Sequence, residues 1–321
     1  MEDNSLNNYN REKDNEPNLI INLNEEYKIK IEKGNQFYKS IFKDVYTAAL
    51  NNVEGIVDQA NQQNDYDNFN NIIAFTGERG KGKSSSMISF RNALINHHLE
   101  INSEFFSNKK EIVRKKFATI DIVDPSLFRG GESLFEIILA QMFNKFQVDI
   151  KCENSKVSDD DRRALIKQFQ EVFENLQIIN SDRTDLYKKE SIEALSKLAT
   201  SSTLRNCFKD LVSIYLQKFE RQKDYLVIAI DDFDLNTSGA YEMLENIRQF
   251  LIQPNIILLI ACKVEQLRVV VLNHFYREFE LLLKYESTEI TELDLINKSE
   301  KYLEKLIPNE KRLILPNPKM F

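Results

Sequence analysis

Residues 72–84 of the chain read Ile72-Ile73-Ala74-Phe75-Thr76-Gly77-Glu78-Arg79-Gly80-Lys81-Gly82-Lys83-Ser84, and this segment is the strongest indication of the fold. Its first five residues form a short apolar run bounded by turn-forming residues, which predicts a buried strand of a parallel sheet. A glycine-rich loop follows at once, and from Ser84 to about Leu99 apolar residues recur at helical spacing. The sequence therefore predicts a strand, a glycine loop and a helix in direct succession.

The glycine loop has the spacing of a P-loop, in which Gly77 and four further residues precede Gly82-Lys83-Ser84. In that pattern glycines let backbone N–H groups turn inward around phosphates, the lysine neutralises phosphate charge and the serine hydroxyl ligates Mg²⁺. We therefore expect a nucleoside triphosphate to bind here with Mg²⁺, and the absence of an Asn-Lys-x-Asp run favours ATP. The predicted nucleotide-binding residues are Gly77, Glu78, Arg79, Gly80, Lys81, Gly82, Lys83, Ser84 and Ser85.

Strand-like and helical segments alternate along the rest of the chain, which predicts an α/β fold with a parallel sheet. Further strands are predicted at 116–123, 225–230, 255–262 and 311–315, and helices at 35–62, 132–146, 241–251 and 266–284. Between about residues 149 and 222 the segments are charged and helix-favouring, with no strand-like run. This region predicts an insertion of two to four helices.

These elements divide the chain into five predicted parts. They are a disordered polar tail (1–18), an N-terminal segment with an amphipathic helix (19–70), the first part of a nucleotide-binding core (71–150), a helical insertion (151–222) and the second part of the core (223–321). The abrupt end of the chain leaves a missing C-terminal extension as an open alternative.

A cluster of acidic residues, Asp231-Asp232-Phe233-Asp234, follows the predicted strand 225–230. Asp231 is predicted to complete the magnesium shell together with Ser84. Asp232 is predicted to polarise the attacking water, with Lys83 as the second catalytic residue, although capping of the next loop is an alternative role for this aspartate. Lys263 follows the strand 255–262 and is a candidate sensor of the γ-phosphate, with a solvent-facing lysine as the alternative.

The composition restricts the classes of partner. The 321 residues include 50 acidic and 43 basic side chains, so nucleic acid binding would need a local basic patch. Three widely spaced cysteines indicate a reducing compartment, and we expect a cytoplasmic protein. No segment resembles a signal peptide, and the most apolar run, 256–262, is too short to cross a bilayer, so we expect no membrane partner.

Four stretches of the chain resemble the KAP family of P-loop NTPases, in the ASCE division and related to the AAA+ and STAND ATPases. These stretches are residues 77–85, 231–234, 244–255 and 302–307. The sequence departs from the family at Arg79, where an aromatic residue is usual, at Leu235, where a basic residue is frequent, and at Lys263, where an acid is frequent. The resemblance covers most of 70–150 and 223–316 and leaves out the helical insertion.

This resemblance implies a three-layer fold whose parallel sheet has the strand order 5-1-4-3-2, with an additional strand between the P-loop strand and the strand of the acidic cluster. It also implies ATP hydrolysis that drives a conformational switch, in a homo-oligomer or with a partner protein, and a setting in bacterial antiviral defence or signalling. Two alternatives remain open. One is a DNA-associated AAA+-like loader or motor, which the acidic balance disfavours, and the other is a nucleotide-dependent scaffold that does not hydrolyse ATP.

Overall fold

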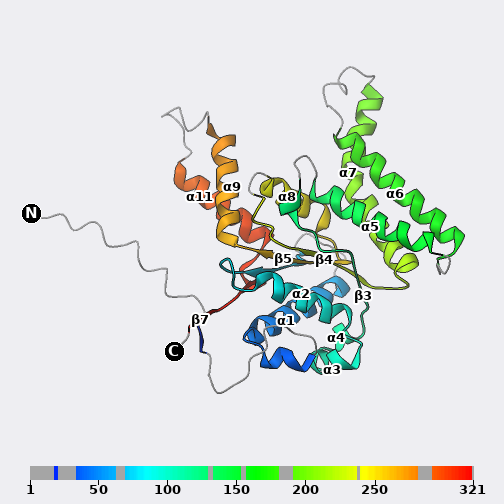
Figure 1. The fold of residues 1–321 in the computed structure, drawn as a ribbon. Helices are drawn as coiled ribbons and strands as arrows, with labels where there is room; N and C mark the ends of the chain where they lie inside the picture. The colour runs from blue at the N-terminus through cyan, green and yellow to red at the C-terminus, as the bar shows by residue number, and fades with distance from the viewer. Residues whose placement is uncertain are drawn as a thin grey trace, which may run out of the picture.

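A parallel sheet lies at the centre of the computed structural model (Figure 1), which describes residues 18–20, 34–62, 69–128, 133–152, 157–180, 191–236, 239–280 and 291–319. Among these residues the sheet has five strands in the order β3-β4-β5-β2-β6. Their bounds are β2 (Ile72–Thr76), β3 (Phe117–Thr119), β4 (Tyr225–Ile230), β5 (Ile256–Cys262) and β6 (Arg312–Ile314). The α/β fold and the parallel sheet expected from the alternation of segments are confirmed.

The three central strands are apolar along their whole length because helices cover both faces of the sheet. Every residue of β2, β4 and β5 is buried. The predicted strands at 72–76 and 225–230 have the bounds of β2 and β4, and β5 begins one residue later than predicted. Such strands can be predicted from the sequence, because both of their faces are buried and every position is therefore apolar or nearly so.

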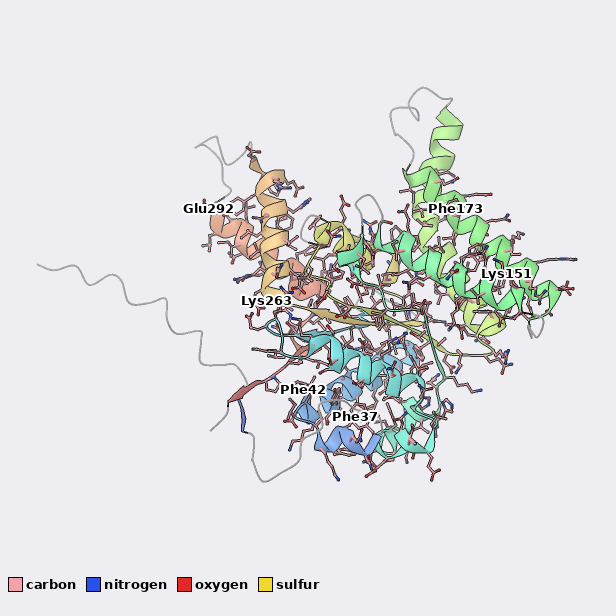
Figure 2. All side chains as sticks on the ribbon, viewed as in Figure 1. Phe37, Phe42, Lys151, Phe173, Lys263 and Glu292 are labelled. Atoms are coloured by element: carbon pink, nitrogen blue, oxygen red, sulfur yellow. The ribbon has the colours of Figure 1, made fainter. Side chains whose placement is uncertain are left out.

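One face of the sheet is covered by the helices of the N-terminal half (Figure 1). They are α1 (Lys43–Gln62), α2 (Lys83–Ile95), α3 (Glu100–Phe106) and α4 (Lys110–Val113). Phe37 and Phe42, at the entry to α1, lie on this side of the sheet (Figure 2) and belong to the same buried cluster as Phe75 of β2. The short helices α3 and α4 are not predicted from the sequence, because they bury few residues each.

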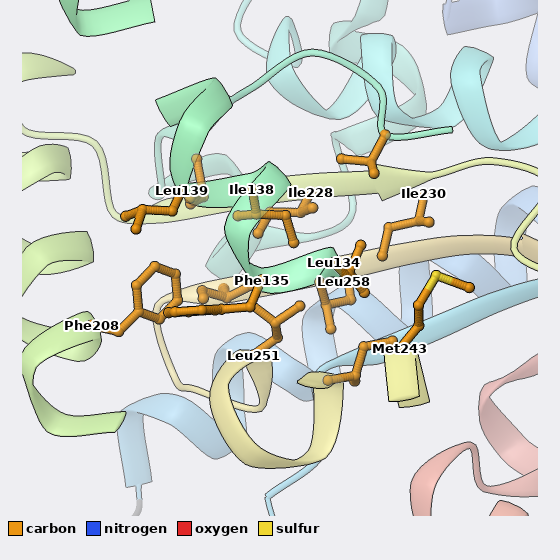
Figure 3. Packing of buried hydrophobic residues seen from close by; sticks show 14 of the residues in the cluster. Leu134, Phe135, Ile138, Leu139, Phe208, Ile228, Ile230, Met243, Leu251 and Leu258 are labelled. Atoms are coloured by element: carbon orange, nitrogen blue, oxygen red, sulfur yellow. The ribbon is translucent and has the colours of Figure 1, made fainter. Parts of the chain in front are cut away.

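The opposite face is covered by the remaining helices (Figure 1). They are α5 (Leu134–Lys151), α6 (Asp159–Asn180), α7 (Ser191–Ile214), α8 (Ala240–Asn246), α9 (Val264–Glu278) and α11 (Glu292–Leu306). Ile138 of α5 packs beside Ile228 of β4, and Phe135 lies against Phe208 of α7 at 4.8 Å between ring centroids (Figure 3). The predicted helical insertion thus consists, in its described part, of α6, α7 and a π-helical end at Tyr215–Phe219.

Several predicted bounds are wrong. The strand predicted at 116–123 ends at Thr119 as β3, and Val123 forms only an isolated bridge to Ile230. The reason is that side chains, and not strand partners, bind the backbone carbonyls at this point. The Thr119 hydroxyl donates to Val227 O of β4, and Arg91 Nη2 donates to Ile120 O, directly after β3. Ladder pairing is interrupted there until the chain returns to β4.

The helix predicted at 35–62 is also divided. Residues 34–39 form a 3₁₀ helix, and α1 starts only at Lys43. Between them the buried Ser40 accepts a hydrogen bond on its hydroxyl from Phe42 N at 3.1 Å, a local turn that competes with helical pairing. The helix predicted at 241–251 is α8 followed by a π-helical turn at Ile247–Leu251, and α11 is not predicted from the sequence.

The ends of the described chain meet in a second sheet. Strand β1 (Asn18–Ile20) pairs in parallel with β7 (Asn317–Lys319), and within the described ranges this sheet has two strands. Apart from Asn18, the predicted polar tail 1–18 lies outside the described residues. In the described part of the chain, no helix has the length and apolarity needed to traverse a membrane.

A buried asparagine ties the amino end of β2 to the segment that leads into β5. The Nδ2 amide of Asn71 donates to the carbonyl oxygens of Leu251, Gln253 and Ile256, at 2.8, 3.2 and 2.9 Å. Asn71 is fully buried, so water does not reach these three carbonyls from the side that its amide occupies. Buried backbone acceptors must be satisfied, and the two N–H groups of this amide serve three of them, so that one N–H is shared between two carbonyls.

We expect Asn71→Ala to lower the free energy of unfolding by roughly 2–4 kcal/mol, because it leaves buried carbonyl groups without a donor. Urea denaturation measures this change. Asn51→Ala is the matched control, since this exposed asparagine of α1 makes no such bonds, and the replacement should be neutral or stabilise by up to about 0.7 kcal/mol through helix propensity. Equal losses in the two variants would contradict the role of Asn71.

Candidate functional site

The glycine-rich loop, residues 77–82, joins the carboxyl end of β2 to the first residue of α2. Gly80 and Gly82 have φ angles of +83° and +85°, in the left-handed region that favours glycine. A Cβ atom on Gly82 would also lie 3.3 Å from the Phe42 ring. The loop conformation therefore requires glycine at these two positions, and it leaves the N-terminus of α2 facing the edge of the sheet where ligands of open α/β folds bind.

Lys83 is the first residue of α2 and connects the loop with the acidic cluster. Its side chain is largely buried, with 9% of the residue exposed, and its ammonium donates to Glu78 O at 3.3 Å. The pKa of Asp232 is raised, mainly by burial, and the charge of Lys83 offsets a small part of this rise. Ser84 follows in the first turn of α2 and is partly buried, while Ser85 and Arg79 are exposed. Ser84 shares no hydrogen bond with Asp231 in the part of the chain that the structure describes.

The acidic cluster begins where β4 ends, beside the carboxyl end of β5. Asp231 N donates to Val123 O at 2.8 Å, and Phe233 N donates to Ala261 O at 3.1 Å. Between them Asp232 has a φ of +44°, an uncommon conformation for a residue with a side chain, which Asp and Asn tolerate best. Hydrogen bonds on both sides, to Val123 and to Ala261 of β5, hold the backbone of this turn at Asp232.

Burial raises the pKa of Asp232, and the neighbouring carboxylates of Asp231, Asp124 and Asp234 raise it further. Asp234 is 5% exposed, and its carbonyl accepts a hydrogen bond from Gln266 Nε2 at 2.9 Å. The role of Asp124 is not predicted from the sequence. A signal for it does exist, because Asp124 follows the predicted strand 116–123 as Asp231 follows β4, and parallel strands end at one edge.

Lys263, directly after β5, reaches across to the glycine loop. Its ammonium lies 2.7 Å from Oε1 and 2.8 Å from Oε2 of Glu78, and both side chains are partly exposed. This hydrogen bond is the main reason that the pKa of Lys263 is raised and that of Glu78 is lowered. Figure 2 locates Lys263 at the start of α9, beside the end of the sheet. The ion pair links the candidate sensor to the candidate nucleotide loop.

Ser84 and Asp231 could contribute ligands to a magnesium ion that also binds phosphate. No group of three or more His, Cys, Asp or Glu side chains in the described residues is arranged to hold a metal. Mg²⁺ commonly takes one or two protein ligands and completes its shell with phosphate oxygens and water. Ser84 and Asp231, at neighbouring ends of α2 and β4, are residues that such an ion would use.

The raised pKa of Asp232 predicts how this residue affects stability. A carboxyl group whose pKa is raised on folding favours the folded state below its unfolded pKa of roughly 3.9, and this contribution is lost as pH rises through the folded pKa. We therefore expect Asp232→Asn, which keeps a residue tolerant of positive φ, to raise Tm at neutral pH by about 2 °C or more. The difference from wild type should vanish near pH 4, to within about a degree.

Thermal unfolding of both proteins across this pH range measures the effect. Asp58→Asn is the control, because Asp58 lies on α1 away from the cluster. A rise in Tm that is the same at about pH 8 and about pH 4 would contradict the assignment to a titrating carboxylate.

No protein-family model matches this chain, and no curated protein matches it. The functional assignment therefore depends on the geometry of the glycine loop, the acidic cluster and Lys263.

Proposed function

We propose that the protein binds ATP with Mg²⁺ at the glycine loop and hydrolyses it to drive a conformational switch. The observation that carries the proposal is the position of Lys83. Its ammonium donates to the backbone of the loop, and its charge acts on the carboxylate of Asp232, which follows β4. A cation between a phosphate-binding loop and an acidic cluster is the arrangement that phosphoryl transfer requires.

The topology of the sheet supports the same proposal. Counted from β2 as the first strand of the nucleotide-binding core, the order β6-β2-β5-β4-β3 reads 5-1-4-3-2. Strand β5 thus lies between the strand of the glycine loop and the strand of the acidic cluster, as the ASCE architecture would have it. This arrangement brings three segments to one edge of the sheet, namely the glycine loop, Asp231-Asp232 and Lys263.

In the proposed reaction Lys83 and the loop N–H groups bind the β- and γ-phosphates and offset their charge. Asp232 accepts a proton from a water molecule as its oxygen attacks the γ-phosphorus, while the bond from that phosphorus to the β–γ bridging oxygen breaks. The products are ADP and inorganic phosphate. Ser84 and Asp231 would hold a bound Mg²⁺, which would supply charge neutralisation at the phosphate oxygens.

The pair Lys263–Glu78 supports a sensing role within this site. A γ-phosphate is a stronger anionic partner than a partly exposed glutamate, so nucleotide would compete with Glu78 for the ammonium. Exchange of partners would transmit the state of the nucleotide to β5, which ends directly before Lys263, and to α9, which begins directly after it. The setting in bacterial defence or signalling, and the homo-oligomer or partner protein that would respond, follow from the family resemblance alone.

We expect Mg²⁺-dependent ATP hydrolysis by the purified protein, and loss of this activity in two variants for different reasons. Lys83→Ala should abolish ATP binding, and Asp232→Asn should retain ATP binding while lowering kcat about 100-fold or more. Asn is preferred to Ala at position 232 because it tolerates the positive φ. Phosphate release measures turnover, and titration calorimetry with ATP measures binding.

Other outcomes separate the alternatives. Tight ATP binding without turnover, lost in Lys83→Ala, would favour the nucleotide-dependent scaffold. Turnover that rises severalfold with DNA would favour the loader or motor. Binding that survives Lys83→Ala would contradict the assignment of the glycine loop.

A second pair of variants tests the sensor. Lys263→Met should lower kcat about tenfold or more while the Kd for ATP stays within about threefold, because the ammonium contributes in the transition state. Glu78→Gln removes the same ion pair but keeps the lysine, so its kcat should stay near that of the wild type. Equal losses in both variants would mean that only the ion pair matters, and would contradict contact of Lys263 with the phosphate.

A further inference from the structure

A cavity of about 660 Å³ lies at the edge of the sheet opposite to the glycine loop. Its lining includes Asn70, Pro254 and Lys311, which directly precede or lie near the amino ends of β2, β5 and β6. Because these strands are parallel, the glycine loop and Lys263 lie at their other ends. The cavity is therefore separate from the candidate nucleotide site, and its volume is in the range of small-molecule sites.

Basic side chains dominate the charged lining of this cavity. Arg205 and Lys209 come from α7, Arg248 from the π-helical turn before β5, Lys305 from α11, and Lys311 precedes β6. Glu310 is the acidic residue in the described lining. The basic groups thus converge from three parts of the chain that are far apart in sequence, although the protein as a whole carries an excess of acidic residues.

Lys311 is the most informative of these residues. It is 7% exposed, and its ammonium has no hydrogen-bond or ion-pair partner within the described ranges. Burial lowers the pKa of Lys311, which the nearby Glu310 only partly offsets. Lys311 lines the cavity, so an anion bound there could supply the interaction that partial burial removes from its ammonium.

The other cations differ in how far the protein already neutralises them. Arg248 is paired with Glu245, its Nη2 lying 2.6 Å from Oε2, and the Tyr302 hydroxyl donates to the same carboxylate at 2.6 Å. Arg205 donates to a neutral acceptor, Ile252 O, at 3.0 Å. Arg205 and Lys311 therefore retain charge toward the cavity, and an arginine fork matches the oxygens of a phosphate group.

We propose that this cavity is a second anion-binding site, which takes a phosphorylated small molecule. The proposal does not depend on ATP hydrolysis at the glycine loop. Several cations around one open cavity suit a ligand of more than one negative charge, which a phosphate ester supplies and a monocarboxylate does not. Phe69 and Tyr302 in the lining leave apolar surface for the organic part of such a ligand.

The test uses the full chain with Lys83→Ala, so that the glycine loop makes no contribution, and inorganic pyrophosphate as the probe. At millimolar pyrophosphate we expect Tm to rise by about 3 °C or more relative to potassium chloride of equal ionic strength. Titration calorimetry gives the affinity. The absence of any rise in Tm and of any binding heat would overturn the proposal, whatever the outcome of the ATPase measurements.

Two further variants in the same background locate the site. Lys311→Met should weaken pyrophosphate binding at least about tenfold, because it removes a charge-assisted hydrogen bond. The Tm of Lys311→Met without ligand should not fall, because burial disfavours the lysine charge that the variant lacks. An unchanged Tm would show that weaker binding is not the result of misfolding. Lys301→Met is the matched control, an exposed lysine of α11 outside the cavity, and should bind like its parent. Equal weakening in both variants would place the anion elsewhere and overturn the assignment.

Adenosine monophosphate and ribose 5-phosphate, titrated in the same way, distinguish the two sources of a phosphate ester. Tighter binding of the nucleotide than of pyrophosphate would identify a base-containing ligand, and tighter binding of the sugar phosphate would identify a smaller one. Either result supports the site if Lys311→Met weakens it.

Discussion

The parallel pairing of β5 with both β2 and β4 is the constraint on which the rest of this structure depends. Its register places Thr76 opposite Cys262 and Ile230 opposite Ile260. The residues that follow these strands, Gly77, Asp231 and Lys263, are therefore brought to one edge of the sheet although they are far apart in sequence. The Asn71 side chain helps to hold this register, because it binds the segment that leads into β5 at the amino end of β2.

Charge is distributed unequally over the edge that this pairing creates. Lys83 and Lys263 lie on the side of the glycine loop, and carboxylates follow β3 and β4. The charge of Lys263 is compensated by Glu78. The repulsion between Asp232 and its neighbouring carboxylates is not fully compensated, since the pKa of Asp232 remains raised. Such unrelieved repulsion stores free energy that a bound cation or a proton releases, which is a common condition of sites built for catalysis.

The opposite edge of the sheet has a different chemistry. Asn71 joins β2 to the approach of β5 there, and the adjoining cavity collects cations from α7, α11 and the segment before β6. The helical insertion thus meets the core at the edge remote from the glycine loop. A ligand at that junction would contact α7 of the insertion and the residues 252–254 that lead into β5, the strand that Lys263 follows at its other end.

The amino-acid sequence alone is sufficient to predict the strands and helices that have a clear apolar pattern of their own. The bounds of β2, β4, β5 and α2 are predicted to within a few residues. The positions of Asp231, Asp232 and Lys263 directly after strands are also predicted. The residue at which β3 ends and the partners of the charged side chains depend on the tertiary structure. The end of β3 depends on Arg91 and Thr119, the pairing of Lys263 with Glu78 joins residues 185 positions apart, and Asp124 and Lys311 have their environment set by other segments. Local periodicity records burial along one element, whereas contacts between elements depend on register and packing, which no short window of sequence contains.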